Sequence, residues 1–226
     1  MNLLLIETSG LEASLAVADD SGVQLERRLD TAGQRNARLL IPAVDELLRE
    51  LNWQPTEVDV IAVSVGPGSF TGLRVGIVFA KTFAWVNNAR LVAVDTLQGI
   101  AQRLFPTPNT VIAVSDAQRG DVFVNSYQGS HLATAVGEVH IEPLEAVLAD
   151  VASMKVGILT GPAIGRFGDR IPASLKIAPP DRQAPLASSL LPMTRQKIDT
   201  QDWEDPDTLE PLYLRRSYAE EKNAAQ

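Results

Sequence analysis

The stretch SVGPGSFTGLRVGIVFAKTFAW, residues 64–85, raises the central question about fold and function. It joins the end of an apolar run to a glycine-rich turn and then to a nearly uncharged segment with helical character. The turn resembles a phosphate loop, but a Walker motif needs a lysine directly after its second glycine, and here the next lysine is Lys81. A nucleophile elbow would need glycines at the positions of Pro67 and Thr71. Neither catalytic template fits.

Two interpretations of the turn remain. Gly66 and Gly68 can adopt backbone angles denied to other residues, and Ser69 or Thr71 can cap the first amides of a helix. These features favour a tight strand-to-helix turn. Because a helix start also attracts anions, a phosphate site is the alternative.

The segment after the turn carries a stripe of small residues at every fourth position: Gly72, Gly76, Ala80 and Ala84. Such a stripe allows another helix to approach closely. Larger apolar residues on the other faces are expected to pack on a sheet: Val75, Ile77, Val78, Phe79 and Phe83. A helix that is apolar nearly all round must be covered on more than one side, either by a helix over residues 36–51 or by a partner. The predicted partner interface comprises the small-residue stripe, Arg74, Leu40 and Val44, and a self-complementary face of this kind predicts a dimer.

The composition excludes several classes of protein. The 226 residues are 45% hydrophobic and 21% charged, as is typical of a globular protein, and the net charge of −8 disfavours extensive nonspecific binding of nucleic acid. Without cysteine there is no disulfide, thiolate nucleophile or cysteine metal site. The start MNLLLIETSG lacks the basic region of a signal peptide, and no apolar run approaches the ~20 residues that span a bilayer. We therefore expect a cytoplasmic protein without membrane contact.

The order of predicted elements repeats along the chain. Each half has three strands, a helix, a further strand and a Gly-Pro turn, which is Gly66-Pro67 in the first half and Gly161-Pro162 in the second. The predicted elements are strands over 3–6, 13–18, 23–29 and 58–66 around the helix over 36–51, then strands over 111–116, 121–127, 133–141 and 156–160 around a short helix from Pro143. This order predicts a duplicated α/β fold of the actin, sugar-kinase and Hsp70-ATPase (RNase H-like) superfamily.

The same order predicts the lobe boundaries. We expect an N-terminal lobe over residues 1–106 that carries the partner-binding helices and a C-terminal lobe over 107–217. Five prolines between residues 172 and 192 predict a loop across the second lobe, with one weak helix at most. Residues 218–226 are expected to be a disordered tail.

GPGSFTGLRVGI (66–77), preceded by the strand IAVSV, resembles the signature of the TsaB (YeaZ) family, bacterial partners in making threonylcarbamoyladenosine on tRNA. Four further segments are similar to this family and occur in the family's order. They are MNLLLIETSGLEASLAV at the start, LLIPAVDELL in the first predicted helix, DAQRGDVFV (116–124) and EPLYLRRS (210–217). The resemblance therefore covers most of the chain.

The resemblance implies a noncatalytic subunit. Family members pair through two N-lobe helices with TsaD, the enzyme that transfers threonylcarbamoyl to adenosine, and the ATPase TsaE joins that pair. TsaD relatives hold their metal with an H-x-x-x-H pair, whereas His131 and His140 here are nine residues apart. The implied partners are TsaD in a heterodimer, TsaE in the complex and a second copy when the chain is alone, with tRNA contact indirect or weak. No catalytic residue and no metal site are expected.

The resemblance also implies a vestigial nucleotide site, made of Glu7, Thr8, Ser9, Asp116 and Gly161. Glu7 stands where Asp is usual in the family, so it is either a carboxylate in reach of hydrated magnesium or a strand-end acid exposed to water. Asn36 stands near a usual histidine and is also a good N-cap. No tightly bound cofactor is expected, and whether ATP or ADP binds at the junction with TsaD stays open.

Two charged groups in the second half have open interpretations. Asp116, Arg119 and Asp121 suit a phosphate or metal site, or a turn whose charges neutralise one another. Arg215 and Arg216 suit a contact with TsaD or tRNA, or a solvated face. The alternative function is a stand-alone ATP-dependent phosphotransferase or a peptidase-like enzyme. It would need nucleotide and metal held by Glu7, Asp116 and the Gly-Pro turns, or a reactive serine with a base.

Overall fold

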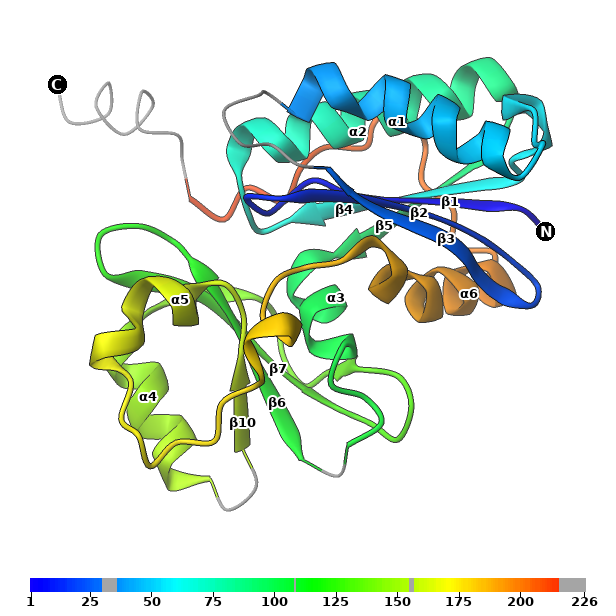
Figure 1. Ribbon diagram of the computed structural model, residues 1–226. Helices are drawn as coiled ribbons and strands as arrows, with labels where there is room; N and C mark the ends of the chain where they lie inside the picture. The colour runs from blue at the N-terminus through cyan, green and yellow to red at the C-terminus, as the bar shows by residue number, and fades with distance from the viewer. Residues whose placement is uncertain (30–35, 108, 155–156, 216–226) are drawn as a thin grey trace, which may run out of the picture.

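The computed structural model describes residues 1–29, 36–107, 109–154 and 157–215, except for the side chains of residues 36 and 37. The described chain forms two lobes, each built on a five-stranded sheet with helices packed against it (Figure 1). The predicted duplicated α/β fold with two lobes is confirmed. The predicted N-cap side chain of Asn36, Arg216 and the predicted tail over 218–226 lie outside the described residues.

The first sheet has the strand order β3-β2-β1-β4-β5. Its strands are β1 (Leu3–Glu7), β2 (Ala13–Asp19), β3 (Gly22–Leu29), β4 (Val60–Gly66) and β5 (Arg90–Asp95). β1 pairs antiparallel with β2 and parallel with β4. Every residue of β1 is buried, because helices cover both faces of this sheet. One face carries α1 (Asn36–Glu50) and α2 (Phe70–Asn87), which lie side by side in Figure 1 on the side away from the second lobe.

The second sheet has the order β10-β6-β7-β8, and β9 also pairs with β7. Its strands are β6 (Thr110–Asp116), β7 (Asp121–Gln128), β8 (Thr134–Ala135), β9 (His140–Pro143) and β10 (Gly157–Thr160). The helices α4 (Leu144–Ser153) and α5 (Ala163–Phe167) pack on one face, and α3 (Thr96–Gln102) packs on the other. The single strand predicted over 133–141 is instead two short strands, because residues 136–139 leave the ladder.

The repeat between the lobes extends to backbone conformation. Gly66 follows β4 with a φ of 120°, and Gly161 follows β10 with a φ of 121°. These strands hold equivalent places, since each is the parallel neighbour of the first strand of its sheet. β5 pairs with β4 at the edge of the first sheet. At the equivalent place beside β10, the second sheet has an isolated parallel bridge between Leu159 and Ile177. Glycine is favoured at both turns because residues with a side chain rarely adopt a positive φ.

The chain returns to the first lobe after residue 186, which corrects the predicted lobe boundary for this segment. The 3-10 helix η4 (Ala187–Leu190) and α6 (Leu191–Thr200) bury Leu190 and Met193 against the face of the first sheet opposite α1 and α2. This contact removes the second apolar face of β1 from water. The other 3-10 helices are η1 (Pro55–Glu57), η2 (Gly168–Arg170) and η3 (Pro180–Arg182). None of the helices in the described ranges is long and apolar enough to cross a membrane.

Residues 203–215, here called the C-terminal strap, run along the first lobe and end on the second. Trp203 packs with the η4 and α6 cluster, and the amide of Leu212 donates to the Val65 carbonyl at 2.8 Å. Leu214 then packs into the core between α3 and the second sheet. The strap therefore connects the two lobes at the edge of the cleft between them.

Candidate partner surface and interlobe cleft

The glycine turn leads into a capped helix. Ser69 is the N-cap of α2, and its side chain accepts a hydrogen bond from the Gly72 amide at 3.3 Å. The Ser69 amide donates to the Ser9 carbonyl at 2.8 Å, so the turn is fastened to the loop after β1. These contacts support the structural interpretation of the turn.

The small-residue stripe of α2 faces inward, which corrects the predicted interface. A Cβ atom at Gly72 would lie 2.0 Å from the Thr8 carbonyl oxygen, and one at Gly76 would lie 2.2 Å from Thr8 Oγ1. The glycines thus allow the helix to rest on the end of β1. The other predicted interface residues apart from Arg74 are also buried in the core of the first lobe: Ala80, Ala84, Leu40 and Val44. Small residues at every fourth position correctly indicated a helix face that another element approaches closely. That element is the end of the protein's own first strand and not a partner helix.

The outward face of the two helices is apolar. Val78, Trp85 and Val86 of α2 are 61%, 79% and 65% exposed, and Ile41 of α1 is 63% exposed. Positions 78, 85 and 86 share one side of a helix because they are seven and eight residues apart. We call Ile41, Val78, Trp85 and Val86 the helical face. Large apolar side chains exposed on two neighbouring helices make this face a candidate protein interaction site.

Arg74 is exposed but bound within the chain. Its guanidinium lies 3.9 Å from the centre of the Phe70 ring, and its Nε donates to the Tyr213 hydroxyl at 2.8 Å. The Phe70 and Tyr213 ring centres are 5.1 Å apart. This cluster joins the start of α2 to the C-terminal strap at the edge of the cleft. No sequence signal linked Tyr213 to Phe70, since 143 positions separate them in the chain.

A cleft of about 630 Å³ lies between the lobes. Residues from both lobes and the strap line it, among them Ser9, Ser69, Phe70, Asp116, Arg119, Arg166, Tyr213 and Arg215. Of the predicted vestigial nucleotide site, the cleft brings together Ser9 and Asp116. The lining does not include Glu7, Thr8 or Gly161, which are all buried.

Glu7 is fully buried beneath the loop after β1. Its Oε1 atom accepts hydrogen bonds from the amide of Ser9, at 2.6 Å, and from the hydroxyl of Ser9. Burial raises the pKa of Glu7 above its ordinary value of 4.5, and the hydrogen bonds from Ser9 offset this in part. Glu7 is therefore neither a strand-end acid exposed to water nor a carboxylate open to the cleft, which corrects both interpretations.

Gly161 has a backbone role. A Cβ atom there would lie 1.9 Å from the Val114 carbonyl oxygen. Together with its positive φ, this close approach requires glycine whether or not any ligand binds nearby.

The second-lobe acids are paired within the chain. Asp116 Oδ1 accepts from the Gln118 amide at 2.9 Å, and Oδ2 forms an ion pair with Arg166. Asp121 pairs with Arg215 at 2.6 Å. These contacts favour the interpretation of a turn with neutralised charges, although the partners come from distant segments. The described residues contain no group of three or more His, Asp or Glu side chains placed to hold a metal ion.

Arg215 is bonded within the chain and does not form a solvated face, and its contact with TsaD or tRNA stays a prediction. Its guanidinium donates to the carbonyls of Ala117 and Gln118 as well as to Asp121, and its side chain is 22% exposed. Arg215 therefore fastens the end of the strap to the second lobe.

Comparison with known proteins places this geometry in a family. The sequence model of one family, described as "TsaD: tRNA N6-adenosine threonylcarbamoyltransferase", matches residues 30–165, more than half of the chain. The chain is 32% identical over 128 residues to the tRNA threonylcarbamoyladenosine biosynthesis protein TsaB of Bacillus subtilis, a match that covers 57% of this chain and 56% of that protein. The chain thus spans little more than half the length of this relative.

Two other matches extend over nearly the whole chain. It is 27% identical to TsaB of Escherichia coli, with 98% of each chain covered. A solved structure from Pseudomonas aeruginosa, described as similar to peptidase YeaZ, is 26% identical with a TM-score of 0.80, and the match covers 95% of this chain and 99% of that one. The chain belongs to the family described as TsaD, tRNA N6-adenosine threonylcarbamoyltransferase, and within it to the TsaB (YeaZ) group.

Proposed function

We propose that this protein is a noncatalytic subunit that binds and supports a TsaD-type transferase in the threonylcarbamoyladenosine modification of tRNA. The helical face is the observation that carries the proposal, because Trp85 is 79% exposed among other exposed apolar residues. Relatives named for threonylcarbamoyladenosine biosynthesis supply the reaction. The likeness to a transferase family supplies the kind of partner.

The chemistry of the helical face suits a stable protein contact. Burial of a large apolar side chain contributes about 1.5–3 kcal/mol, and Trp is enriched among the residues that dominate binding energy. The four side chains together offer several kcal/mol toward the cost of association. In the absence of the transferase, the same face would pair two copies of this chain.

The engagement of Glu7 and Asp116 supports a noncatalytic role. A stand-alone phosphotransferase would need these carboxylates open to nucleotide and metal, whereas Glu7 is fully buried with its Oε1 atom bonded to Ser9, and Asp116 is paired with Arg166. We therefore place ATP or ADP at the junction with the partner instead of in a tight site of this chain. TsaE joins the complex, and contact with tRNA is indirect or weak, as the net charge of −8 favours. The cytoplasm is the expected compartment.

The test is size-exclusion chromatography with light scattering on this chain, on the TsaD protein of the same organism and on their mixture. We expect a one-to-one complex that forms at the expense of any homodimer. If the two proteins elute separately at micromolar concentration, with and without ATP and TsaE, the proposed partnership is wrong. A rise in melting temperature with ATP for this chain alone, together with turnover, would favour the enzyme alternative.

A further inference from the structure

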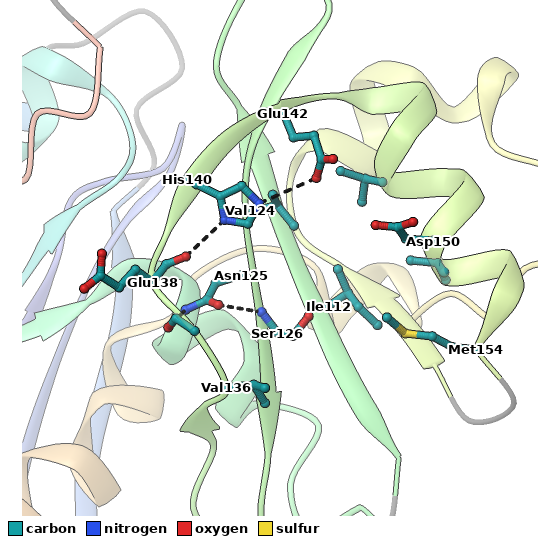
Figure 2. Close-up of a pocket in the computed structure, with 13 residues that line it drawn as sticks. Ile112, Val124, Asn125, Ser126, Val136, Glu138, His140, Glu142, Asp150 and Met154 are labelled. Carbon is teal, nitrogen blue, oxygen red and sulfur yellow. Dashed lines mark hydrogen bonds and ion pairs between the residues drawn. The ribbon is translucent and has the colours of Figure 1, made fainter.

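A second surface feature, a groove of about 300 Å³, lies in the second lobe between α4 and the strands β7 and β9 (Figure 2). Its apolar floor consists of Ile112, Val124, Val147 and Val151, from β6, β7 and α4, and the polar Asn125 and Ser126 of β7 also line the groove. Apolar surface continues to its edges, where Val136 is 60% exposed and Met154 is 39% exposed.

Two carboxylates flank the apolar floor. Figure 2 shows Glu142 on the β9 side and Asp150 on the α4 side. The carboxylate of Glu138 points away from these two, so Glu142 and Asp150 carry the argument. The His140 ring is held beside Glu142, with Nε2 3.5 Å from Glu142 Oε2 and Nδ1 3.0 Å from the Glu138 carbonyl oxygen.

The described residues that line the groove include no lysine or arginine. The Glu142 side chain is 31% exposed and Asp150 is exposed, so both can meet an incoming group. The groove therefore combines an apolar track with negative charge at its side. Anionic occupants are disfavoured by this arrangement, and a cationic group is favoured over a neutral one by the charge of Glu142 and Asp150.

We propose that this groove binds an arginine or lysine side chain of a partner protein. The methylene stem of such a side chain would lie on Val124, Val147 and Val151, while its charged head would pair with Glu142 and Asp150. Small-molecule sites enclose most of their ligand, whereas this groove is open and has exposed apolar edges. An open groove suits a side chain that enters from another protein's surface. The site lies in the second lobe and is separate from the helical face of α1 and α2.

The binding test uses butylguanidinium as a probe for an arginine side chain. The full chain carries ¹³C-labelled valine, isoleucine and methionine methyl groups, and their NMR signals are followed during titration. We expect saturable shifts at Val124, Val147, Val151 and Met154, with binding weakened about threefold between 50 and 500 mM salt. Pentanoate has a similar chain but a negative head, and it should leave these signals unchanged.

Variants separate charge from fold. The double change Glu142→Gln and Asp150→Asn should weaken butylguanidinium binding about three- to tenfold. Asp169→Asn, which removes one charge elsewhere in the second lobe, should leave binding unchanged. Equal binding of pentanoate, or unchanged affinity in the double variant, would overturn the proposal. If the double variant instead changes the oligomeric mass of this chain, the occupant is a second copy and the assignment to a different protein is wrong.

Discussion

Gly76 lies directly against Thr8: a Cβ atom at position 76 would stand 2.2 Å from the Oγ1 atom of that buried threonine. Gly72, one turn earlier, approaches the carbonyl oxygen of the same residue. Thus α2 docks on the end of β1 through bare backbone at two successive turns. The small-residue stripe stabilises the lobe from within, and the proposed partner surface lies on the other side of the helix, where Trp85 is exposed.

Gly72→Ala is therefore expected to destabilise the fold. The added methyl would stand 2.0 Å from a backbone oxygen, which can move only if β1 or α2 shifts. Overpacking of this kind costs about 1–3 kcal/mol in the free energy of unfolding, measured by urea denaturation. Gly165→Ala is the matched control, since a Cβ atom at that helical position meets nothing within 4 Å. It should be neutral or slightly stabilising, and an equal loss in the two variants would contradict this account.

The sequence predicted the two lobes and their repeated order because buried parallel strands and their Gly-Pro turns leave strong local patterns. It did not predict α6 or the return of residues 187–200 to the first lobe. That segment has a low density of apolar residues along its helix, and the otherwise uncovered face of the first sheet determines where Leu190 and Met193 pack. Long-range contacts of this kind leave no periodic signal.

The sequence indicated the helix α2 as the candidate surface, but it did not indicate which residues of that helix are exposed. The sequence pointed to α2 as a helix covered on two sides, and α2 does carry exposed apolar side chains. The small-residue stripe was predicted to face a partner. Small residues allow close packing against a partner helix and against the protein's own sheet alike, so the pattern does not distinguish the two. Trp85 offered a usable signal, since Gly72 and Gly76 lie on the buried side and Trp85 lies on the other.

Trp85→Glu should abolish or strongly weaken complex formation with TsaD while the chain stays folded. The side chain is 79% exposed, so its replacement disturbs little of the core. Removal of this exposed aromatic side chain and placement of a charge in the proposed contact should reduce affinity by at least about 30-fold, corresponding to roughly 2 kcal/mol. Isothermal titration calorimetry gives the affinity, and thermal unfolding confirms the fold.

Val78→Glu and Val23→Glu form a matched pair for the same surface. Both positions are exposed valines, at 61% and 40%, but Val23 lies on β3 and outside the helical face. Val78→Glu should weaken binding to TsaD, whereas Val23→Glu should not. Equal effects of the two changes would mean that the helical face is not the contact surface.

Glu7→Gln should stabilise the protein increasingly as pH rises. Burial raises the pKa of Glu7 above 4.5, so the folded state holds a proton that the unfolded state releases. The stabilising contribution of that proton is complete below about pH 4.5 and is lost as pH rises through the folded-state pKa. Glutamine stays neutral and can still accept the bond from the Ser9 amide.

Urea unfolding at pH 5 and pH 8 tests this prediction. The difference in unfolding free energy between Glu7→Gln and the unchanged chain should be larger at pH 8. Ser9→Ala removes a hydroxyl that donates to the carboxyl group, so it should raise the pKa of Glu7 further and keep the proton bound to a higher pH. A difference that is constant with pH would show that Glu7 ionises in the folded state as it does in the unfolded chain.

Arg215→Ala should release the end of the C-terminal strap from the second lobe. The change removes hydrogen bonds to the carbonyls of Ala117 and Gln118 and leaves Asp121, 28% exposed, without its ion-pair partner. Because charged hydrogen bonds contribute about 1.5–3 kcal/mol when partly buried, we expect a loss of roughly 1–3 kcal/mol in unfolding free energy. Limited proteolysis with mass spectrometry should show faster cleavage within residues 203–215.

Arg49→Ala is the control, since Arg49 forms an exposed pair with Asp45 on α1, and its loss should cost below about 0.5 kcal/mol. If both variants resist protease as well as the unchanged chain does, then the aromatic contact of Tyr213 with Phe70, and not Arg215, holds the strap across the cleft.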